Sequence, residues 1–518
     1  MKVTSFVDRI AITRLRTQRI TTKLGIALGL ACCLLASAAQ ADVTLPNVFG
    51  DHMVLQQAQK NRVWGKAAAG EEITVTIEKQ KQSATADQDG KWQVTLDPLP
   101  VGGPYEMNVK GKNEIKFSDI LVGEVWICSG QSNMQWPVNA SNDADLEKLA
   151  AKFPKLRMIN FPQVGTQEPI WSHDDRQWQV CTPETVGNFS AVGYFFARQL
   201  HETLDVPIGM INNAWGGSSC EAWINRDLLA ADPQYAPLME RWAGMEKSYA
   251  ELKDSQDANP QQKKQLESAM KGQARPGNIY NGVLKSHLGY GIRGAIWYQG
   301  ESNASSAYQY RELFPLMISS WRKEWNQGDF PFYWVQLADF MAEQPEPTES
   351  AWAELREAQT MAMNKLPNTG QAVIIDIGEG KDIHPKNKVD VGHRLARWAL
   401  AKEYGIDVPY HSPQYKSMEK SGNKIVLTFD HVGPAWRPFD VAQPRGFAIA
   451  GADKKFVWAD TKIVEGNKVE VSSANVSEPV AVRYAWADNP VCNMFSSAGL
   501  PLTPFRTDDW PGKTANAK

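Results

Sequence analysis

The sequence predicts a three-layer α/β domain with a parallel sheet, flanked by an N-terminal and a C-terminal β-rich module. Two observations predict this architecture. In the middle of the chain, short and continuously apolar runs alternate with amphipathic helical stretches, which is typical of buried parallel strands and their crossover helices. At both ends of the chain, apolar and polar residues alternate, which is typical of half-buried strands. A length of 518 residues is enough for two or three such domains.

Residues 1–41 have the composition of a secretory signal peptide. Basic residues precede an apolar run at 24–35, and Ala39-Gln40-Ala41 is a small-x-small cleavage site. The run is short for a bilayer, so a transmembrane anchor is the less favoured interpretation. No later segment is apolar enough to cross a membrane. We therefore expect cleavage near Ala41 and a periplasmic or secreted protein with no membrane span in the mature chain.

Charge and cysteine content narrow the function classes. Residues 1–41 carry six Lys and Arg and one Asp, so the remainder has 49 basic and 57 acidic residues and a net charge of −8. Nucleic-acid-binding domains normally present a basic face, so we expect no nucleic-acid partner. The remaining cysteines are too few for a disulfide scaffold, and the sequence does not choose among their possible pairings. They are Cys128, Cys181, Cys220 and Cys492.

The N-terminal part, residues 42–117, predicts a β-sandwich-like module. Apolar and polar residues alternate over 73–77 and again over 92–96. Asp89-Gly90 supplies a turn just before the second of these runs.

Residues 118–407 predict the α/β domain. Its strands are expected at 120–128, 206–211, 294–298, 332–337 and 372–377, and its amphipathic helices at 192–204 and around 391–399. A charged, Gln-rich segment at 228–274 predicts a helical insertion. Such an insertion can cap a site, but a solvated pair of surface helices is the simpler interpretation.

Residues 408–518 predict the C-terminal β-rich module. Strands are expected at 425–429 and 456–458, and Gly466-Asn467 is a hairpin signal between two further strands.

Four loops, each expected at the carboxyl end of a parallel strand, carry residues suited to ester hydrolysis. They are Gly130-Gln131-Ser132-Asn133-Met134, Asn213-Ala214-Trp215-Gly216-Gly217-Ser218-Ser219, Tyr298-Gln299-Gly300-Glu301-Ser302-Asn303 and Asp382-Ile383-His384-Pro385. Sites in doubly wound sheets form at this edge. Each loop alone has a plain structural explanation, such as a tight turn or a surface histidine. Together, in this order, they predict a serine hydrolase.

The chemistry explains why these residue types belong together. A serine in a tight turn at a helix start places backbone N–H groups where negative charge develops. A glycine pair leaves an amide unobstructed, and an Asn side chain can donate to the same oxyanion. The base must be oriented by a second group, and His384 has an acidic residue two positions before it.

The order of these loops resembles that of the SGNH hydrolases, and the amino-acid sequences of the loops most resemble those of the sialate O-acetylesterase family. The similarity is carried by 123–136, 215–217, 296–303, 382–388, 355–359 and 504–508, so it covers nearly the whole mature chain. The resemblance implies hydrolysis of acetyl esters on a saccharide, without a metal or organic cofactor. Sialic acid is the expected acetylated sugar, and a plant polysaccharide such as xylan is the alternative.

The resemblance also implies residue roles. Ser132 is the nucleophile, His384 the general base and then acid, and Asp382 the group that orients His384. The oxyanion hole is formed by the amides of Ser132 and Gly217 and the side chain of Asn303. Gln131, Trp215 and Glu301 are expected to contact substrate.

Two departures from the wider superfamily affect these roles. Gln131 stands where many SGNH enzymes have Asp, and Asp382 precedes His384 by two positions rather than three. A Ser–His dyad, in which a backbone carbonyl orients His384, therefore stays open beside the triad.

Two other classes match the sequence less well. A non-catalytic carbohydrate-binding protein would suit two β modules and 19 tryptophans, but it has no need of a nucleophile and a base. A metal-dependent deacetylase needs histidines at ligand spacing, and no pair has it.

Overall fold

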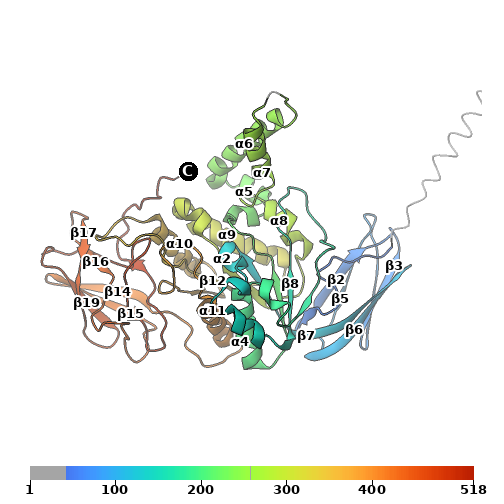
Figure 1. The fold of residues 1–518 in the computed structure, drawn as a ribbon, viewed down its shortest axis with the longest axis horizontal. Helices are drawn as coiled ribbons and strands as arrows, with labels where there is room; N and C mark the ends of the chain where they lie inside the picture. The colour runs from blue at the N-terminus through green and yellow to red at the C-terminus, as the bar shows by residue number, and fades with distance from the viewer. Residues whose placement is uncertain (1–41, 257, 518) are drawn as a thin grey trace, which may run out of the picture.

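The computed structural model describes residues 42–256 and 258–517, and Figure 1 shows a mixed α/β centre between two β-rich ends. The expected signal peptide, 1–41, lies outside the described residues. The central part of the main sheet has the strand order β13-β12-β11-β7-β10-β8-β9. These strands are β7 (Glu114–Gly130), β8 (Phe153–Asn160), β9 (Gln179–Cys181), β10 (Ile208–Asn212), β11 (Gly294–Tyr298), β12 (Phe332–Val335) and β13 (Thr369–Ala372). All neighbouring pairs are parallel except β8 with β9.

Helices cover both faces of this sheet, which confirms the three-layer prediction. The larger helices are α4 (Ala191–Leu204), α9 (Ala307–Trp325), α10 (Ala351–Lys365) and α11 (Lys388–Lys402), and the shorter ones are α2 (Ser132–Gln135), α3 (Ala144–Ala150) and α8 (Asn278–Gly282). Strand β12 shows the two faces, because successive side chains of a strand point to opposite sides. Trp334 packs edge-on against Phe314 of α9 with ring centroids 5.1 Å apart, whereas Tyr333 packs against Trp398 of α11 at 6.0 Å.

Polar caps fix where the helices begin. The side chain of Ser190 accepts a hydrogen bond from the backbone of Gly193 at the start of α4, and Ser350 does the same for Ala353 at the start of α10. Such caps satisfy backbone N–H groups that have no partner within the helix. The expected helices at 192–204 and 391–399 are confirmed as α4 and α11.

Strand β7 belongs to both the N-terminal module and the central sheet. It is 17 residues long. Its first half pairs with β6 (Gly102–Lys110) and β1 (Val54–Gln56), and its second half pairs with β10 and β11. The expected boundary between residues 117 and 118 therefore falls inside one continuous strand.

The N-terminal module consists of two packed groups of strands. One is the antiparallel pair β2 (Asn61–Lys66) and β5 (Lys91–Leu96), and the other joins β3 (Glu72–Ile77) and β4 (Gln80–Thr85) to β6 and β7. The expected strands at 73–77 and 92–96 are confirmed as β3 and β5.

The C-terminal module contains two four-stranded sheets around a core of its own. One sheet is β14 (Gln414–Ser421), β15 (Lys424–Asp430), β19 (Lys468–Ser472) and β18 (Asp460–Ile463); the other is β17 (Phe456–Trp458), β16 (Phe447–Ala450), β20 (Ala481–Tyr484) and β21 (Phe505–Arg506). The strands expected at 425–429 and 456–458 and the hairpin at Gly466-Asn467 are all present.

The strand expected at 372–377 is wrong in its position. The structure has β13 at Thr369–Ala372, and the residues that follow leave the sheet. The reason is that they serve two cores: Ile374 packs in the main core, whereas Val373 and Ile375 pack in the core of the C-terminal module. An apolar run that joins two cores has the same local pattern as a buried strand.

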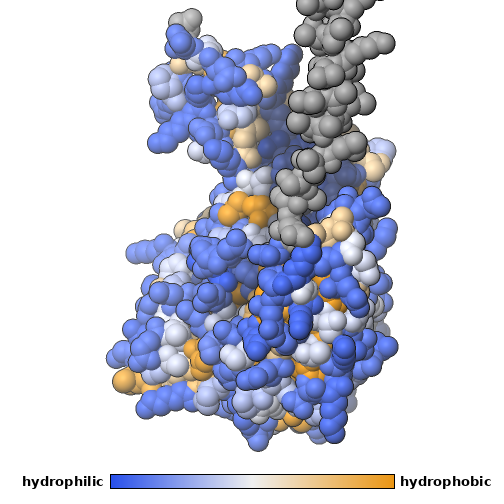
Figure 2. Space-filling view, turned by 90° about the vertical axis from the view of Figure 1, so that its right-hand side faces the viewer, coloured by the Kyte–Doolittle hydropathy of each residue, from blue (hydrophilic) through white to orange (hydrophobic). Residues whose placement is uncertain are grey.

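The helical insertion projects from the body as α5 (Arg226–Ala231), α6 (Ala236–Leu252) and α7 (Pro260–Met270), at the top of Figure 1. Trp242 is the buried residue of α6 and Met270 that of α7. Figure 2 shows that the projecting part is covered mostly by hydrophilic residues. No helix within 42–256 or 258–517 is long and apolar enough to cross a bilayer.

The four cysteines that follow residue 41 are free thiols, and Cys128, Cys181 and Cys220 are buried. Burial raises the pKa of Cys181 and of Cys492 to about 12, so these thiols stay protonated at neutral pH.

Candidate active site

The turn that presents Ser132 depends on the glycine two residues before it. Gly130 has φ +128°, and a Cβ atom there would lie 2.2 Å from the backbone oxygen of Tyr298. The backbone N–H of Gln131 donates to the same oxygen at 2.9 Å. The close contact with β11 thus requires glycine, and it places Ser132 at the first position of α2, directly beyond β7.

Ser132 and His384 are in hydrogen-bond contact, although 252 positions separate them. His384 Nε2 lies 2.9 Å from Ser132 Oγ. The imidazole stacks on the indole of Trp136, with ring centroids 4.7 Å apart and an interplanar angle of 16°. The pair has the geometry of a nucleophile and its general base, and the stacked indole holds the base in place.

Asp382 lies on the far side of the imidazole. Its Oδ1 is 3.4 Å from His384 Nδ1 and accepts a hydrogen bond from the backbone N–H of His384 at 2.9 Å. Its other oxygen is 3.6 Å from Lys386 Nζ. That backbone hydrogen bond is the main reason why the pKa of Asp382 lies below its ordinary value. The carboxylate is therefore ionised at neutral pH and beside the ring.

The pKa of His384 is lowered, first by burial and then by the positive charge of Lys388, while Asp382 opposes both effects. A lowered pKa keeps His384 neutral at mildly acidic pH, which is the state that a general base needs.

The two backbone amides expected in the oxyanion hole have no hydrogen-bond partner within their own elements. The N-terminal position of Ser132 in α2 leaves its N–H without a partner in the helix. Gly217 has φ +72°, and its N–H makes no hydrogen bond within the described residues. Its neighbour Gly216 lies against the nucleophile, since a Cβ there would be 3.4 Å from Ser132 Cβ, but its N–H donates to Gln135 Oε1 at 2.8 Å.

Asn303, expected as the third oxyanion donor, is bonded elsewhere. Its Nδ2 donates to Glu221 at 2.9 Å, and its Oδ1 accepts from the backbone of Cys220 and from Gln299. It lines a separate cavity with Glu221. Through these bonds Asn303 joins the second loop to the third. This role differs from the expected contact of its side chain with an oxyanion.

A buried network behind Ser132 joins three of the four loops through Asn133. Asn133 Nδ2 donates to Glu301 Oε1 at 2.7 Å and to the backbone oxygen of Ile383 at 2.9 Å. Asn133 Oδ1 accepts from Lys388 Nζ at 2.5 Å. The bond to Ile383 fixes the residue before His384 to the residue after Ser132. The network therefore sets the relative position of base and nucleophile.

Lys388 is the unusual member of this network, because its side chain is fully buried. Burial lowers its pKa to about 7, although Glu301 and the acidic residues of the histidine loop oppose this effect. Its ammonium lies 5.4 Å from the ring centroid of Tyr298 and 5.8 Å from that of Trp136. Burial also raises the pKa of Glu301.

The expected substrate contacts of Gln131 and Glu301 differ from their places in the structure. Gln131 is buried, and its Oε1 accepts from the backbone of Gly300 at 3.3 Å. Glu301 holds Asn133 in the network behind the nucleophile. Trp215 is half-buried, packs against the main core and donates its backbone N–H to Gly130. All three support the loops around Ser132.

An open cavity of about 710 Å³ lies in front of Ser132 and His384. Its wall is rich in amide side chains and includes aromatic rings and one arginine. The residues besides the pair are Gln135, Trp136, Pro137, Asn160, Phe161, Pro162, Gln163, Arg176, Asn188, Asn212 and Ala214. A cavity of this size accepts one or two sugar rings, whose hydroxyl groups match amide side chains.

Sequence reasoning gave no role to Asn133, Lys388 or Arg176. A signal for Lys388 was present, because a lysine at the first position of a helix opposes the helix dipole and needs another reason to be there. Arg176 comes from a loop before β9 that carries no motif, and only the fold brings it to the cavity.

A nucleophilic serine and its histidine base, at the carboxyl edge of a parallel sheet covered by helices on both faces, define a serine esterase of the SGNH type. Residues 122–253 and 268–401 match the family described as carbohydrate esterase, sialic acid-specific acetylesterase, and the chain belongs to this family.

Known relatives agree with this assignment. The sialate O-acetylesterase of Mus musculus is 29% identical over 505 residues, which cover 88% of this chain and 92% of the relative. That of Homo sapiens is 28% identical over 550 residues, with coverage of 95% and 99%. A solved structure of a carbohydrate acetylesterase from Xanthomonas citri is 39% identical with a TM-score of 0.80, and covers 90% of this chain and 100% of that chain. The protein is a carbohydrate O-acetylesterase.

Proposed function

We propose that the protein removes O-acetyl groups from sialic acid. The observation that supports this proposal is the charge of the side chains that line the cavity. Apart from His384, Arg176 is the one charged side chain among the described residues that line it, and no carboxylate does so. Sialic acid has a carboxylate, and a guanidinium binds a carboxylate through paired hydrogen bonds. A neutral polysaccharide such as xylan would not need this cation.

Arg176 is free to bind such a group. Its side chain is 40% exposed, and its ion-pair partner, Asp175 at 3.4 Å, is exposed as well. An exposed pair of this kind is weak, so a substrate carboxylate can replace it.

In the proposed reaction, His384 Nε2 takes the proton of Ser132 Oγ as that oxygen attacks the acetyl carbonyl carbon. The amides of Ser132 and Gly217 stabilise the oxyanion. Collapse of the tetrahedral intermediate breaks the bond to the sugar oxygen, which receives the proton from His384. Water, activated by the same histidine, then releases acetate from the serine ester.

The experiment compares acetate release from 9-O-acetyl sialic acid and from acetylated xylo-oligosaccharides. We expect kcat/KM to be at least about tenfold higher for the sialic acid, and Arg176→Met to lower that value by about tenfold or more, since a lost charged hydrogen bond costs about 1.5–3 kcal/mol. Asp175→Asn is the matched control, because it keeps the cation. Preference for the xylo-oligosaccharides, or an equal effect of Arg176→Met on both substrates, would contradict the proposal.

We also propose export to the periplasm or the medium after cleavage near Ala41. The composition of residues 1–41 supports this. N-terminal sequencing of the protein from the periplasmic fraction of an expressing bacterium tests it, and an intact N-terminus in the cytoplasmic fraction would contradict it.

A further inference from the structure

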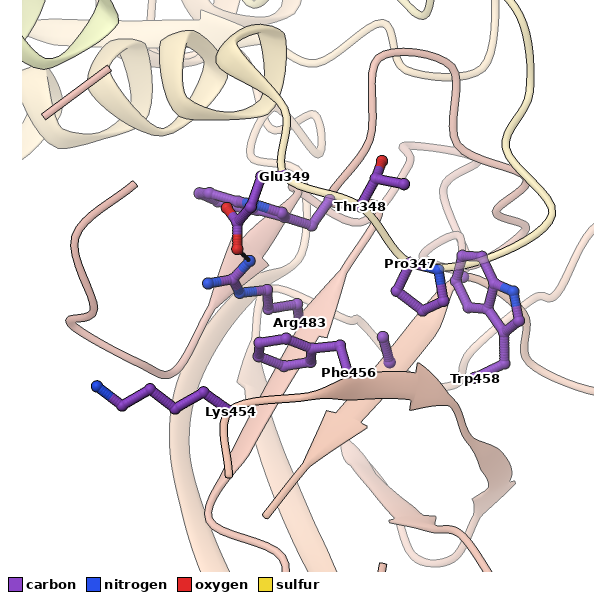
Figure 3. Close-up of a pocket in the computed structure, with 10 residues that line it drawn as sticks. Pro347, Thr348, Glu349, Lys454, Phe456, Trp458 and Arg483 are labelled. Atoms are coloured by element: carbon purple, nitrogen blue, oxygen red, sulfur yellow. Dashed lines mark hydrogen bonds and ion pairs between the residues drawn. The ribbon is translucent and has the colours of Figure 1, made fainter. Parts of the chain in front are cut away.

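A second groove lies in the C-terminal module, on other elements than the Ser132 cavity. One part of it, of about 130 Å³, lies between residues 347–349 and strands β16, β17 and β20 (Figure 3). An adjoining part of about 300 Å³ extends toward Val491. Trp458 and Gly446 line both parts. We call the two parts together the Trp458 groove.

The aromatic wall of the Trp458 groove is exposed but fixed. The side chain of Trp458 is 41% exposed, and its indole N–H donates to the backbone oxygen of Pro345 at 2.7 Å. Phe456 stands two residues earlier in β17 and therefore on the same face of the strand. Figure 3 shows Pro347 beside the indole of Trp458. Apolar rings that are held in place side by side yet left in water are typical of binding surfaces, where exposed apolar side chains form a contiguous patch.

Polar groups at the other end of the Trp458 groove are held in place as well. The guanidinium of Arg483 is 4% exposed, lies 4.2 Å above the ring centroid of Phe456 and pairs with Asp508 and with Glu349 Oε1, each at 2.8 Å. Glu349 is half exposed, and its second oxygen makes no hydrogen bond in the described chain.

Trp486 adds a donor without a partner. This residue lines the groove and is 7% exposed, and its indole N–H makes no hydrogen bond within the described residues. A buried donor that lacks a partner costs free energy. Because this nitrogen is itself buried, the groove offers a ligand its aromatic faces and one free acceptor, the second oxygen of Glu349.

We propose that the Trp458 groove binds a sugar unit of the glycan from which the Ser132 site removes acetyl groups. A sugar ring has C–H faces, which pack on the negative face of an aromatic ring, and hydroxyl groups at its edge, which donate and accept hydrogen bonds. Both features match the groove. The 300 Å³ part alone reaches the lower size limit of ordinary ligand pockets.

One edge of the Trp458 groove, formed by residues 344–349, is also connected to the catalytic histidine loop. Residues 344–349 belong to the segment between β12 and α10, and Asp339 in the same segment accepts a hydrogen bond from the backbone of Gly378 at 2.7 Å. Gly378 leads directly into the loop that holds His384. A glycan bound at this edge is held on the same protein as the Ser132 site, which raises the local concentration of its acetyl groups there.

The first test measures binding to the inactive Ser132→Ala protein by calorimetry, with xylohexaose and 3′-sialyllactose as probes. At least one probe should bind, and adding Trp458→Ala should weaken its binding at least tenfold. Phe439→Ala is the matched control, because Phe439 is a 70% exposed aromatic residue of the same module outside the groove. Using both probes separates this inference from the choice of acetylated sugar. Trp458→Leu, which keeps apolar volume but lacks the flat ring, replaces the alanine variant if that variant does not fold.

The second test compares kcat/KM on an acetylated oligosaccharide with kcat/KM on 4-nitrophenyl acetate, which is too small to reach both sites. The ratio of the two should fall at least fivefold in Trp458→Ala and stay within twofold in Phe439→Ala. The proposal is overturned if neither probe binds, if binding survives the loss of Trp458, or if the ratio does not change.

Discussion

The Oδ1 atom of Asp382 lies 2.9 Å from the backbone nitrogen of His384 but 3.4 Å from the Nδ1 atom of its ring. The shorter contact closes a turn. An aspartate side chain that accepts a hydrogen bond from the backbone N–H two residues later in the chain forms a common type of turn. That turn lets a two-residue spacing bring the carboxylate back toward the imidazole. Asp382 therefore acts on His384 in two ways, by shaping its loop and by its charge.

Two substitutions separate these two actions. Asp382→Asn keeps an oxygen that can accept the backbone bond and loses the charge, whereas Asp382→Ala loses both. We expect Asp382→Asn to lower kcat by about 10-fold to 10⁴-fold, with the upper end set by the buried aspartate of serine proteases. The 3.4 Å distance and the 38% exposure of Asp382 favour the lower end of that range. Asp382→Ala should cost more. Equal losses for the two variants in assays of acetyl ester hydrolysis would show that the charge alone matters.

Ser132→Ala should abolish hydrolysis of acetyl esters and leave the fold intact. Loss of a triad nucleophile lowers kcat about 10⁶-fold in a well-studied serine hydrolase, and His384→Ala should approach the same loss because the two act as a unit. Acetate release measures activity, and circular dichroism confirms the fold. A folded Ser132→Ala protein with a tenth of wild-type activity would rule out this nucleophile.

The pH dependence should report the charge of Lys388. His384 must be neutral to act as a base, so kcat/KM falls as the pH drops through its pKa, which Lys388 lowers. Lys388 has a pKa of about 7 and is mostly protonated over the range in which His384 titrates. Lys388→Met removes that positive charge, so the pKa of His384 should rise and the acidic limb should move to higher pH.

Asp382→Asn provides the opposite control, because its carboxylate favours the charged imidazolium. Removing that charge should lower the pKa of His384 and move the acidic limb to lower pH. If both variants moved the limb in the same direction, loop distortion rather than charge would be the cause.

Activity should survive exhaustive treatment with EDTA. The proposed chemistry needs no Lewis acid, and no group of three or more His, Cys, Asp or Glu side chains in the described chain is arranged to hold a metal ion. Loss of acetate release on chelation, followed by recovery with a divalent metal, would contradict the serine mechanism.

Arg356 should be critical for stability rather than for chemistry. It is fully buried and donates to four backbone oxygens, those of Leu337, Ala338, Ala487 and Asp488, at 2.7–2.9 Å. These oxygens come from the catalytic domain and the C-terminal module. Arg356→Met leaves them without a donor, at about 1–3 kcal/mol each, so the free energy of unfolding should fall by about 3 kcal/mol or more.

Urea denaturation followed by tryptophan fluorescence measures this change. Arg437→Met, at an exposed position of the C-terminal module, is the control and should shift the unfolding midpoint little. A similar midpoint for Arg356→Met and the wild type would show that water replaces the guanidinium.

Much of the fold could be predicted because its signals are local. The continuous apolar pattern of β11 and the 3.6-residue pattern of α4 each follow from which faces are buried. The pairing of Ser132 with His384 could be predicted because both follow strands of one sheet. The end of β13 could not be predicted, because Val373 and Ile375 are apolar residues that pack in the core of the C-terminal module.

The hydrogen-bond partners of the amide and charged side chains in the site could not be predicted from the sequence either. An Asn after a strand can serve an oxyanion or a neighbouring loop, and only the packed structure joins Asn303 to Glu221. Likewise, whether Lys388 faces water or Asn133 depends on how α11 packs against α4.

The continuity of β7 has a consequence for the alignment of the catalytic pair. Ser132 stands two residues beyond a strand whose other end is anchored in the N-terminal module, whereas His384 follows a segment that is anchored in the core of the C-terminal module. The segments that hold the two reacting side chains are thus anchored in modules at opposite ends of the molecule. A protein shortened to residues 118–407 would keep both residues, all four loops and the Asn133 network, yet it would lose these two attachments, which support the loops that hold Ser132 Oγ and His384 Nε2 at 2.9 Å.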